Sequence, residues 1–91
     1  LLALDPATQP DAWRLHLDIA EILLEREDLD GAAHRTAQSI AARDTAPAHM
    51  VLARIALSRG ELTAATREAG LAADLDPDSP GLASILQTNQ P

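Results

Sequence analysis

The sequence predicts an all-α protein built from repeated helix-turn-helix units. Apolar residues recur at helical spacing along most of the chain. When the chain is shifted against itself by 33 residues, His16 falls on His49 and Ala20 on Ala53, and a fixed offset over two helices is the signature of a repeat. Nineteen alanines and fifteen leucines, with one Trp and neither Phe nor Tyr, favour closely packed helices over a sheet. Positions 33 residues apart are called equivalent below.

The repeat divides one domain, residues 1–91, into four parts. Residues 1–6 end an upstream unit, 7–45 form a first full unit with a longer first helix, 46–79 form a second full unit, and 80–91 begin a further unit or a capping helix. The expected architecture is a solenoid of about five antiparallel helices, because a unit of this kind cannot bury its apolar face alone. Since Leu1 lies in the middle of a unit, we expect the chain to be a fragment of a longer repeat protein.

The first unit opens with a helix that is capped at Thr8 or Gln9 and runs to about Arg26. Trp13 lies in the extra turn of this helix, where it either packs against the preceding helix or anchors a partner. Asp28 is the expected N-cap of the next helix, which spans residues 29–43. The predicted core face of that helix consists of Leu29, Ala33, Ala37 and Ile40.

The second unit contains a helix over residues 47–59, with Pro47 in its first turn and Gly60 at the left-handed turn that ends it. A second helix follows over residues 61–75, and Pro77 prevents its continuation. The predicted apolar positions of that helix are Leu62, Ala65, Ala69, Ala72 and Ala73. Ser79 and Pro80 then give a cap-and-proline signal for a short helix over residues 82–86.

One family has this spacing. The second unit holds His49, Leu52, Ala53, Ala56, Ala65, Ala69, Ala72 and Pro77 at its positions. In these residues the chain resembles the tetratricopeptide repeat family, whose pattern runs from an aromatic residue through Leu-Gly, Tyr, Ala and Phe to a closing Pro. Aromatic positions of the family hold Ala56, Leu62 and Ala69 here, so the chain resembles a divergent, alanine-rich member. The first unit departs further, with Glu27 equivalent to Gly60 and Asp44 to Pro77. The resemblance covers about residues 1–86 and implies a non-catalytic scaffold that binds proteins.

The acidic charge balance argues against nucleic acid as a partner. The net charge is -7, there is no lysine, and the seven arginines do not cluster in the sequence. An acidic surface favours a protein or peptide partner with basic groups. No apolar run approaches the roughly 20 residues that span a bilayer, and neither cysteines nor a signal peptide indicate a compartment. Abundant arginine and alanine without lysine are typical of a GC-rich, bacterial genome.

A stripe of polar residues is the candidate binding site. Arg14, Asp18, Glu21 and Glu25 are spaced four, three and four residues apart, so they share one face of the first long helix; these four residues are called the polar stripe. The equivalent residues are Pro47, Val51, Arg54 and Ser58. In the family that the chain resembles, the first helices of the units line a concave groove. We therefore predict a peptide-binding groove formed by Arg14, Leu17, Asp18, Glu21, Glu25, Met50, Val51, Arg54 and Ser58, with Leu17 and Met50 as its apolar patch.

Three alternatives stay open from the sequence. The polar stripe is also compatible with a solvated surface on which Glu21 pairs with Arg54 and Arg14 with Asp18. The chain ends suggest self-association, as a dimer or by head-to-tail stacking, through Leu82, Ile85 and Leu86 at one end and Leu1, Leu2 and Leu4 at the other. A third alternative is a substrate-positioning region of a larger enzyme.

The sequence contains no pattern that predicts catalysis, a metal site or a cofactor. His16, His34 and His49 lack the close spacing of helical zinc ligands. The acidic run of residues 74–78 lacks the glycine turn and the closing Glu of a calcium loop. Glycines and serines occur without the context of a phosphate loop or of a nucleophile paired with a base. We therefore expect a protein that is not an enzyme and binds no cofactor.

Overall fold

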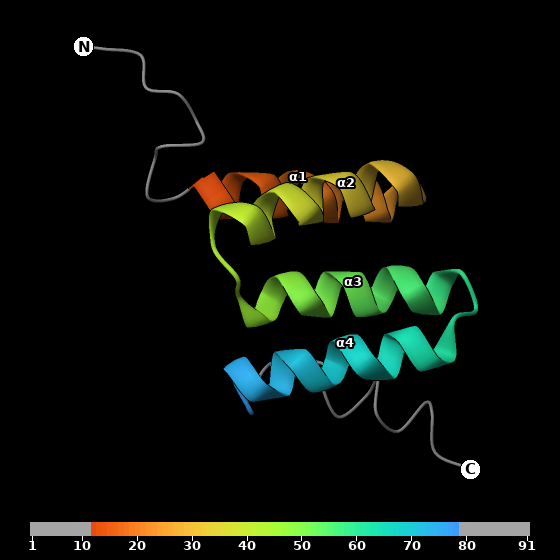
Figure 1. Ribbon diagram of the computed structural model, residues 1–91. Coiled ribbons are helices and arrows are strands. Elements are labelled where there is room, and N and C mark those ends of the chain that lie inside the picture. The colour runs from red at the N-terminus through yellow and green to blue at the C-terminus, as the bar shows by residue number, and fades with distance from the viewer. Residues whose placement is uncertain (1–11, 79–91) are drawn as a thin grey trace. The chain divides into compact units, whose positions relative to one another are not determined.

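The computed structural model describes residues 12–78, which form four α-helices (Figure 1). The helices are α1 (Ala12–Glu25), α2 (Leu29–Ala42), α3 (Ala46–Ser58) and α4 (Leu62–Leu75). Every regular element in these residues is a helix, which confirms the all-α class. The predicted helix over residues 82–86, the caps Thr8 and Gln9, and Leu1, Leu2, Leu4, Leu82, Ile85 and Leu86 lie outside the described residues.

The helices pack in consecutive pairs, α1 with α2 and α3 with α4. Each pair lies in its own compact unit of the chain, residues 1–44 and 45–91. We call α1 with α2 the first hairpin and α3 with α4 the second hairpin. The first residues of α2 and α4 are 33 positions apart, and so are their last residues. The offset found in the sequence therefore reappears in the positions of these two helices.

The turn of the first hairpin is closed by two backbone hydrogen bonds. The N–H of Glu27 donates to the carbonyl of Leu24 over 3.0 Å, and the N–H of Asp28 donates to that of Leu23 over 2.9 Å. This pair of bonds defines a Schellman motif, which requires a left-handed residue between the helix and the following chain. Glu27 is that residue, with φ of 63°.

The turn of the second hairpin repeats this motif at the equivalent residues. Gly60 N–H donates to Leu57 over 3.0 Å, and Glu61 N–H donates to Ala56 over 2.8 Å. Gly60 has φ of 74°, which confirms the predicted left-handed position. The same turn is therefore built with a glycine in one hairpin and with a glutamate in the other.

Replacing Glu27 by glycine is expected to stabilise the first hairpin. A left-handed conformation costs a residue with a Cβ roughly 1–2 kcal/mol, and glycine avoids this cost. Part of the resulting stabilisation is lost again, because glycine has more conformational freedom in the unfolded chain. We expect Glu27→Gly to raise the free energy of unfolding by about 0.5–1 kcal/mol, measured by urea denaturation.

The matched control is Gly60→Ala, which introduces the same strain in the second hairpin. A Cβ at Gly60 would meet no heavy atom within 4 Å, so its cost comes from the backbone conformation and not from a clash. We expect Gly60→Ala to lower the free energy of unfolding. A loss of stability in both variants would contradict the assignment of strain to Glu27.

The starts of α2 and α3 follow the predicted signals, whereas α4 starts without a capping side chain. The side chain of Asp28 accepts a hydrogen bond from the N–H of Gly31 over 3.0 Å, which confirms Asp28 as the N-cap of α2. Pro47 lies in the first turn of α3 as predicted, after Thr45, whose side chain accepts from Ala48. Glu61 precedes α4 without a capping side-chain bond. The start of α4 therefore depends on its packing against α3 more than on a local cap.

The predicted core face of α2 is wrong. Its buried residues are Ala32, Thr36 and Ser39, whereas Ala37 is exposed. The remaining predicted core residues, Leu29, Ala33 and Ile40, are only half-buried. The physical reason is that small residues bring α2 close to α1, and the two buried hydroxyls are satisfied by backbone carbonyls.

The hydroxyl of Thr36 donates to the carbonyl of Ala32 over 2.7 Å, and the hydroxyl of Ser39 donates to the carbonyl of Trp13 over 2.6 Å. The second bond joins the two helices of the hairpin. Trp13 also meets the residue that follows α2, since the Arg43 guanidinium lies 5.6 Å from the centre of its ring. Trp13 therefore links the start of α1 to the end of α2.

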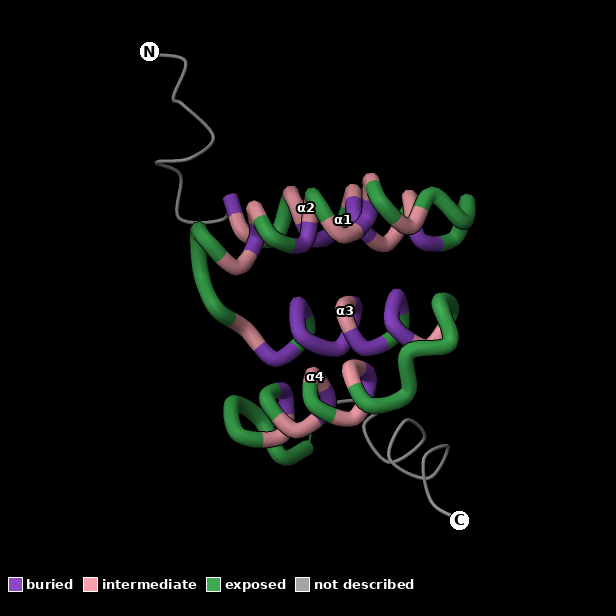
Figure 2. The backbone as a smooth tube through the Cα atoms, turned by 45° about the vertical axis from the view of Figure 1, so that its right-hand side comes forward, coloured by how far each residue is buried: buried purple, intermediate pink, exposed green. Residues whose placement is uncertain are grey.

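The core of the second hairpin is made of small side chains around one methionine. Its buried cluster contains Ala46, Met50, Ala53, Ala69 and Ala72, against which Leu57 and Ala73 pack. Figure 2 shows that α3 is buried along most of its length, whereas α4 is buried along one side. Burial confirms Ala65, Ala69 and Ala72 as core residues of α4, but the prediction for Leu62 is wrong because its side chain is half exposed.

Candidate interaction surface

The polar stripe lies on α1 and reaches solvent. Arg14, Asp18 and Glu25 are exposed, and Glu21 is half-buried. Their intervals of three and four residues place them along one side of the helix, away from the buried residues Leu17, Ala20 and Leu24. The stripe carries one cation at its N-terminal end and three carboxylates after it, so the middle and the end of α1 present negative charge.

The apolar members of the predicted groove are not at the surface. Leu17, Met50 and Val51 are all buried. Leu17 and Met50 are equivalent residues, and Met50 belongs to the core cluster of its hairpin. Neither provides an apolar surface for a ligand in this structure. Arg54 and Ser58, the predicted polar residues of α3, are exposed.

Two exposed residues of α1 were missed from the sequence. Leu15 is 49% exposed and Ile22 is 52% exposed. They lie seven residues apart and therefore on the same face, with the half-buried Ile19 between them. We call Leu15, Ile19 and Ile22 the apolar stripe. The signal was present in the sequence, because Leu15 and Leu17 are two residues apart on a helix and cannot share a face.

The apolar stripe and the polar stripe are neighbours on the surface of α1. Asp18 follows Leu15 by three residues and precedes Ile22 by four, so the three side chains form one row along the helix. We call this row the ladder. Glu25 follows Ile22 by three residues and extends this ladder to the end of α1. Arg26, also exposed, comes directly after it. This face therefore offers two aliphatic side chains with a carboxylate between them.

A histidine bridges the two helices in each hairpin, at equivalent positions. In the first hairpin, Nη1 of Arg35 donates to Nδ1 of His16 over 3.2 Å. In the second, Nδ1 of His49 donates to Oε1 of Glu68 over 2.8 Å, between side chains that are 11% and 17% exposed. Arginine can only donate and a carboxylate can only accept, so the neutral His16 ring carries its proton on Nε2, whereas His49 carries one on Nδ1.

Each of these histidines joins the two helices of its hairpin. Their partners are an arginine and a glutamate of the same hairpin. Within residues 12–78, no group of three or more histidine, cysteine or acidic side chains is arranged to hold a metal ion.

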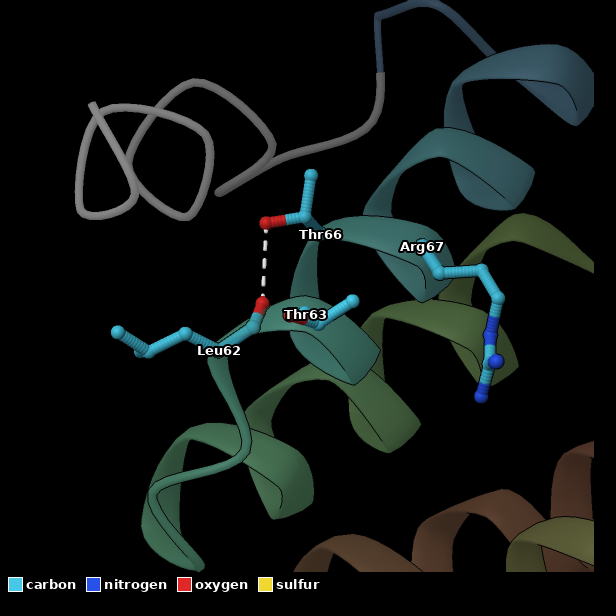
Figure 3. Close-up of a pocket in the computed structure, with 4 residues that line it drawn as sticks. All are labelled: Leu62, Thr63, Thr66 and Arg67. Atoms are coloured by element: carbon cyan, nitrogen blue, oxygen red, sulfur yellow. Dashed lines mark hydrogen bonds between the residues drawn. The ribbon is translucent and has the colours of Figure 1, made fainter.

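Two hollows in the surface lack the groups of a ligand site. Figure 3 shows the hollow beside the first turns of α4, which Leu62, Thr63, Thr66 and Arg67 line. The hydroxyl of Thr66 already donates to the carbonyl of Leu62 over 3.0 Å. The other hollow, of about 260 Å³, is lined by His16, Gln38, Ala41 and Ala42. Ligand sites combine an apolar enclosure with several converging polar groups, and neither hollow does so.

None of the helices in the described part of the chain is long and apolar enough to cross a membrane. No protein-family model, curated protein or solved structure matches the chain.

Proposed function

We propose that the chain is a tetratricopeptide-like protein-interaction module that binds a protein or peptide segment with basic groups through the polar stripe of α1. The similarity of the two hairpins to each other supports the first part of this proposal. Residues 12–78 contain two helical hairpins with the same turn motif and with matching bounds in their second helices. Such hairpins are the building blocks of repeat scaffolds, whose common use is to present helix faces to other proteins.

One observation carries the choice of surface. The polar stripe places three carboxylates on one side of a single helix, and two of them are exposed. Like charges three and four residues apart on a helix destabilise it by a few tenths of a kcal/mol. A basic segment would relieve this repulsion, which gives such a partner an electrostatic advantage over a neutral one. No catalytic step follows from these side chains.

The test is a comparative pull-down from a lysate of the source organism. The native chain is compared with a charge-reversed variant of the polar stripe, Glu21→Arg with Glu25→Arg, after circular dichroism has shown equal helix content. We expect a protein that the native chain retains and the variant loses. The retained protein is then identified by mass spectrometry and examined for a basic binding segment.

The matched control reverses one exposed acid at the end of α4 and one just after it, Asp74→Arg with Asp78→Arg. It changes the net charge by the same amount, so it separates a local effect from a global one. Retention of the same proteins by all three chains would contradict the proposed function. Light scattering over a concentration series tests the alternative of self-association, because a peptide receptor stays monomeric.

A further inference from the structure

The ladder on α1 differs from its counterpart in the second hairpin. The ladder residues Leu15, Asp18 and Ile22 are equivalent to Ala48, Val51 and Ile55, all of which are buried. On α3 this face is therefore wholly apolar and buried. On α1 the same face keeps its two aliphatic side chains about half exposed and has an exposed carboxylate in the middle.

We propose that this face of α1, formed by Leu15, Asp18, Ile22 and Glu25, docks an α-helix of another protein that carries an arginine or lysine between two apolar residues. The inference rests on the proposed function and specifies the chemistry and the conformation of the partner segment.

The partner is helical because of what α1 presents. A helix uses its backbone hydrogen-bonding groups internally, so its face offers side chains only and no backbone donors or acceptors. An extended segment lying on it would gain no backbone hydrogen bonds from this face, whereas a helix needs none because it satisfies its own. Leu15 and Ile22 are separated by two turns, about 10 Å along the axis, and a second helix repeats apolar residues at the same interval.

The partner carries a cation because of Asp18. Covering Leu15 and Ile22 also removes water from the carboxylate between them, and a desolvated carboxylate without a partner is strongly unfavourable. An arginine or lysine opposite Asp18 compensates this loss with a charge-assisted hydrogen bond. Glu25 adds to the requirement, because it ends α1, where the helix dipole disfavours an anion.

The other available occupants do not have this pattern. In a second copy, the exposed leucines of α4 are Leu62, Leu71 and Leu75. Leu62 lies nine residues before Leu71 and therefore on the opposite side of the helix, so only Leu71 and Leu75 share a face, and the residue of that face nearest to Leu75 is Asp74. The arginine of that face, Arg67, precedes both leucines and does not lie between them. The chain's own residues 1–11 contain two aspartates and no arginine. Either occupant would place carboxylates near Asp18, which like-charge repulsion opposes.

The experiment uses two fluorescently labelled synthetic helical peptides. Both carry leucines seven residues apart, and the positions between and beyond them on the same face hold arginine in one peptide and glutamate in the other. Fluorescence anisotropy titrations with the full chain are expected to show binding of the arginine peptide at least about tenfold tighter than binding of the glutamate peptide. In the variant Asp18→Arg with Glu25→Arg, the preference is expected to reverse.

A second pair of variants tests the apolar part of the ladder. Leu15→Gln with Ile22→Gln should weaken binding of the arginine peptide by about tenfold. The matched control, Leu71→Gln with Leu75→Gln, changes two leucines of similar exposure on α4 and should leave the affinity unchanged.

Equal affinity for the two peptides would overturn the inference, as would an equal loss in the Leu71 and Leu75 control. Two results would assign the face to another occupant and also overturn it. One is oligomerisation that Leu15→Gln with Ile22→Gln abolishes, which indicates a second copy. The other is tighter peptide binding by Leu2→Gln with Leu4→Gln, which indicates the chain's own first residues. If the peptides fail while the pull-down still depends on the polar stripe, this inference is wrong and the proposed function stands.

Discussion

Replacing Leu17 by alanine is expected to lower the free energy of unfolding by about 2–4 kcal/mol. Leu17 is only 4% exposed, on the side of α1 that also buries Ala20 and Leu24. Removing its side chain loses apolar burial and leaves a cavity that the small neighbouring side chains fill poorly. Urea denaturation followed by far-ultraviolet circular dichroism measures the change.

The control is Leu15→Ala, two residues earlier on the same helix. Leu15 is half exposed, so its truncation removes little buried surface and alanine favours the helix slightly. We expect a change below about 0.5 kcal/mol. Equal losses at the two leucines would contradict the orientation of α1, and with it both the polar and the apolar stripe.

Enlarging Ala32 to leucine is expected to destabilise the first hairpin by about 1–3 kcal/mol. Ala32 is fully buried in α2, on the face that also holds Thr36 and Ser39. Small side chains at these positions bring the two helices close together, so a leucine forces them apart or distorts the bond from Ser39 to Trp13. The same denaturation experiment measures this effect.

Ala37→Leu is its control, because Ala37 is exposed on the same helix. Both substitutions keep a good helix former, so a difference between them reports packing and not helix propensity. If Ala32→Leu were tolerated as well as Ala37→Leu, the close approach of α1 and α2 would be wrong.

Helices and turns were predictable because their signals are local. The repeat offset, the cap at Asp28 and the left-handed turn at Gly60 each depend on a few neighbouring residues. The offset also makes Glu27 equivalent to Gly60, although glutamate by itself gives no sign of the left-handed conformation that it adopts. Here the repeat supplied information that the residue type lacked.

The faces of the helices were harder to predict because they depend on packing. On α2, the larger aliphatic residues suggested a core face, but the buried positions include Thr36 and Ser39, whose hydroxyls bond to carbonyls. Hydrophobicity alone cannot reveal such bonds. On α1, Leu15 and Leu17 have the same side chain, and only the packing of α1 against α2 decides that Leu17 is the buried one.

The bridging histidines explain how two similar hairpins can carry side chains of opposite charge, Arg35 and Glu68, at equivalent positions. A lysine in place of His16 or His49 could only donate hydrogen bonds and an aspartate could only accept them, so each would pair with a partner of one charge only. The same imidazole nitrogen, by contrast, accepts a hydrogen bond from Arg35 in one hairpin and donates one to Glu68 in the other. A single substitution at the partner position can therefore invert the local charge without breaking the link between the helices. In a protein assembled from duplicated hairpins, this leaves surface electrostatics free to diverge between copies while the shared architecture is retained.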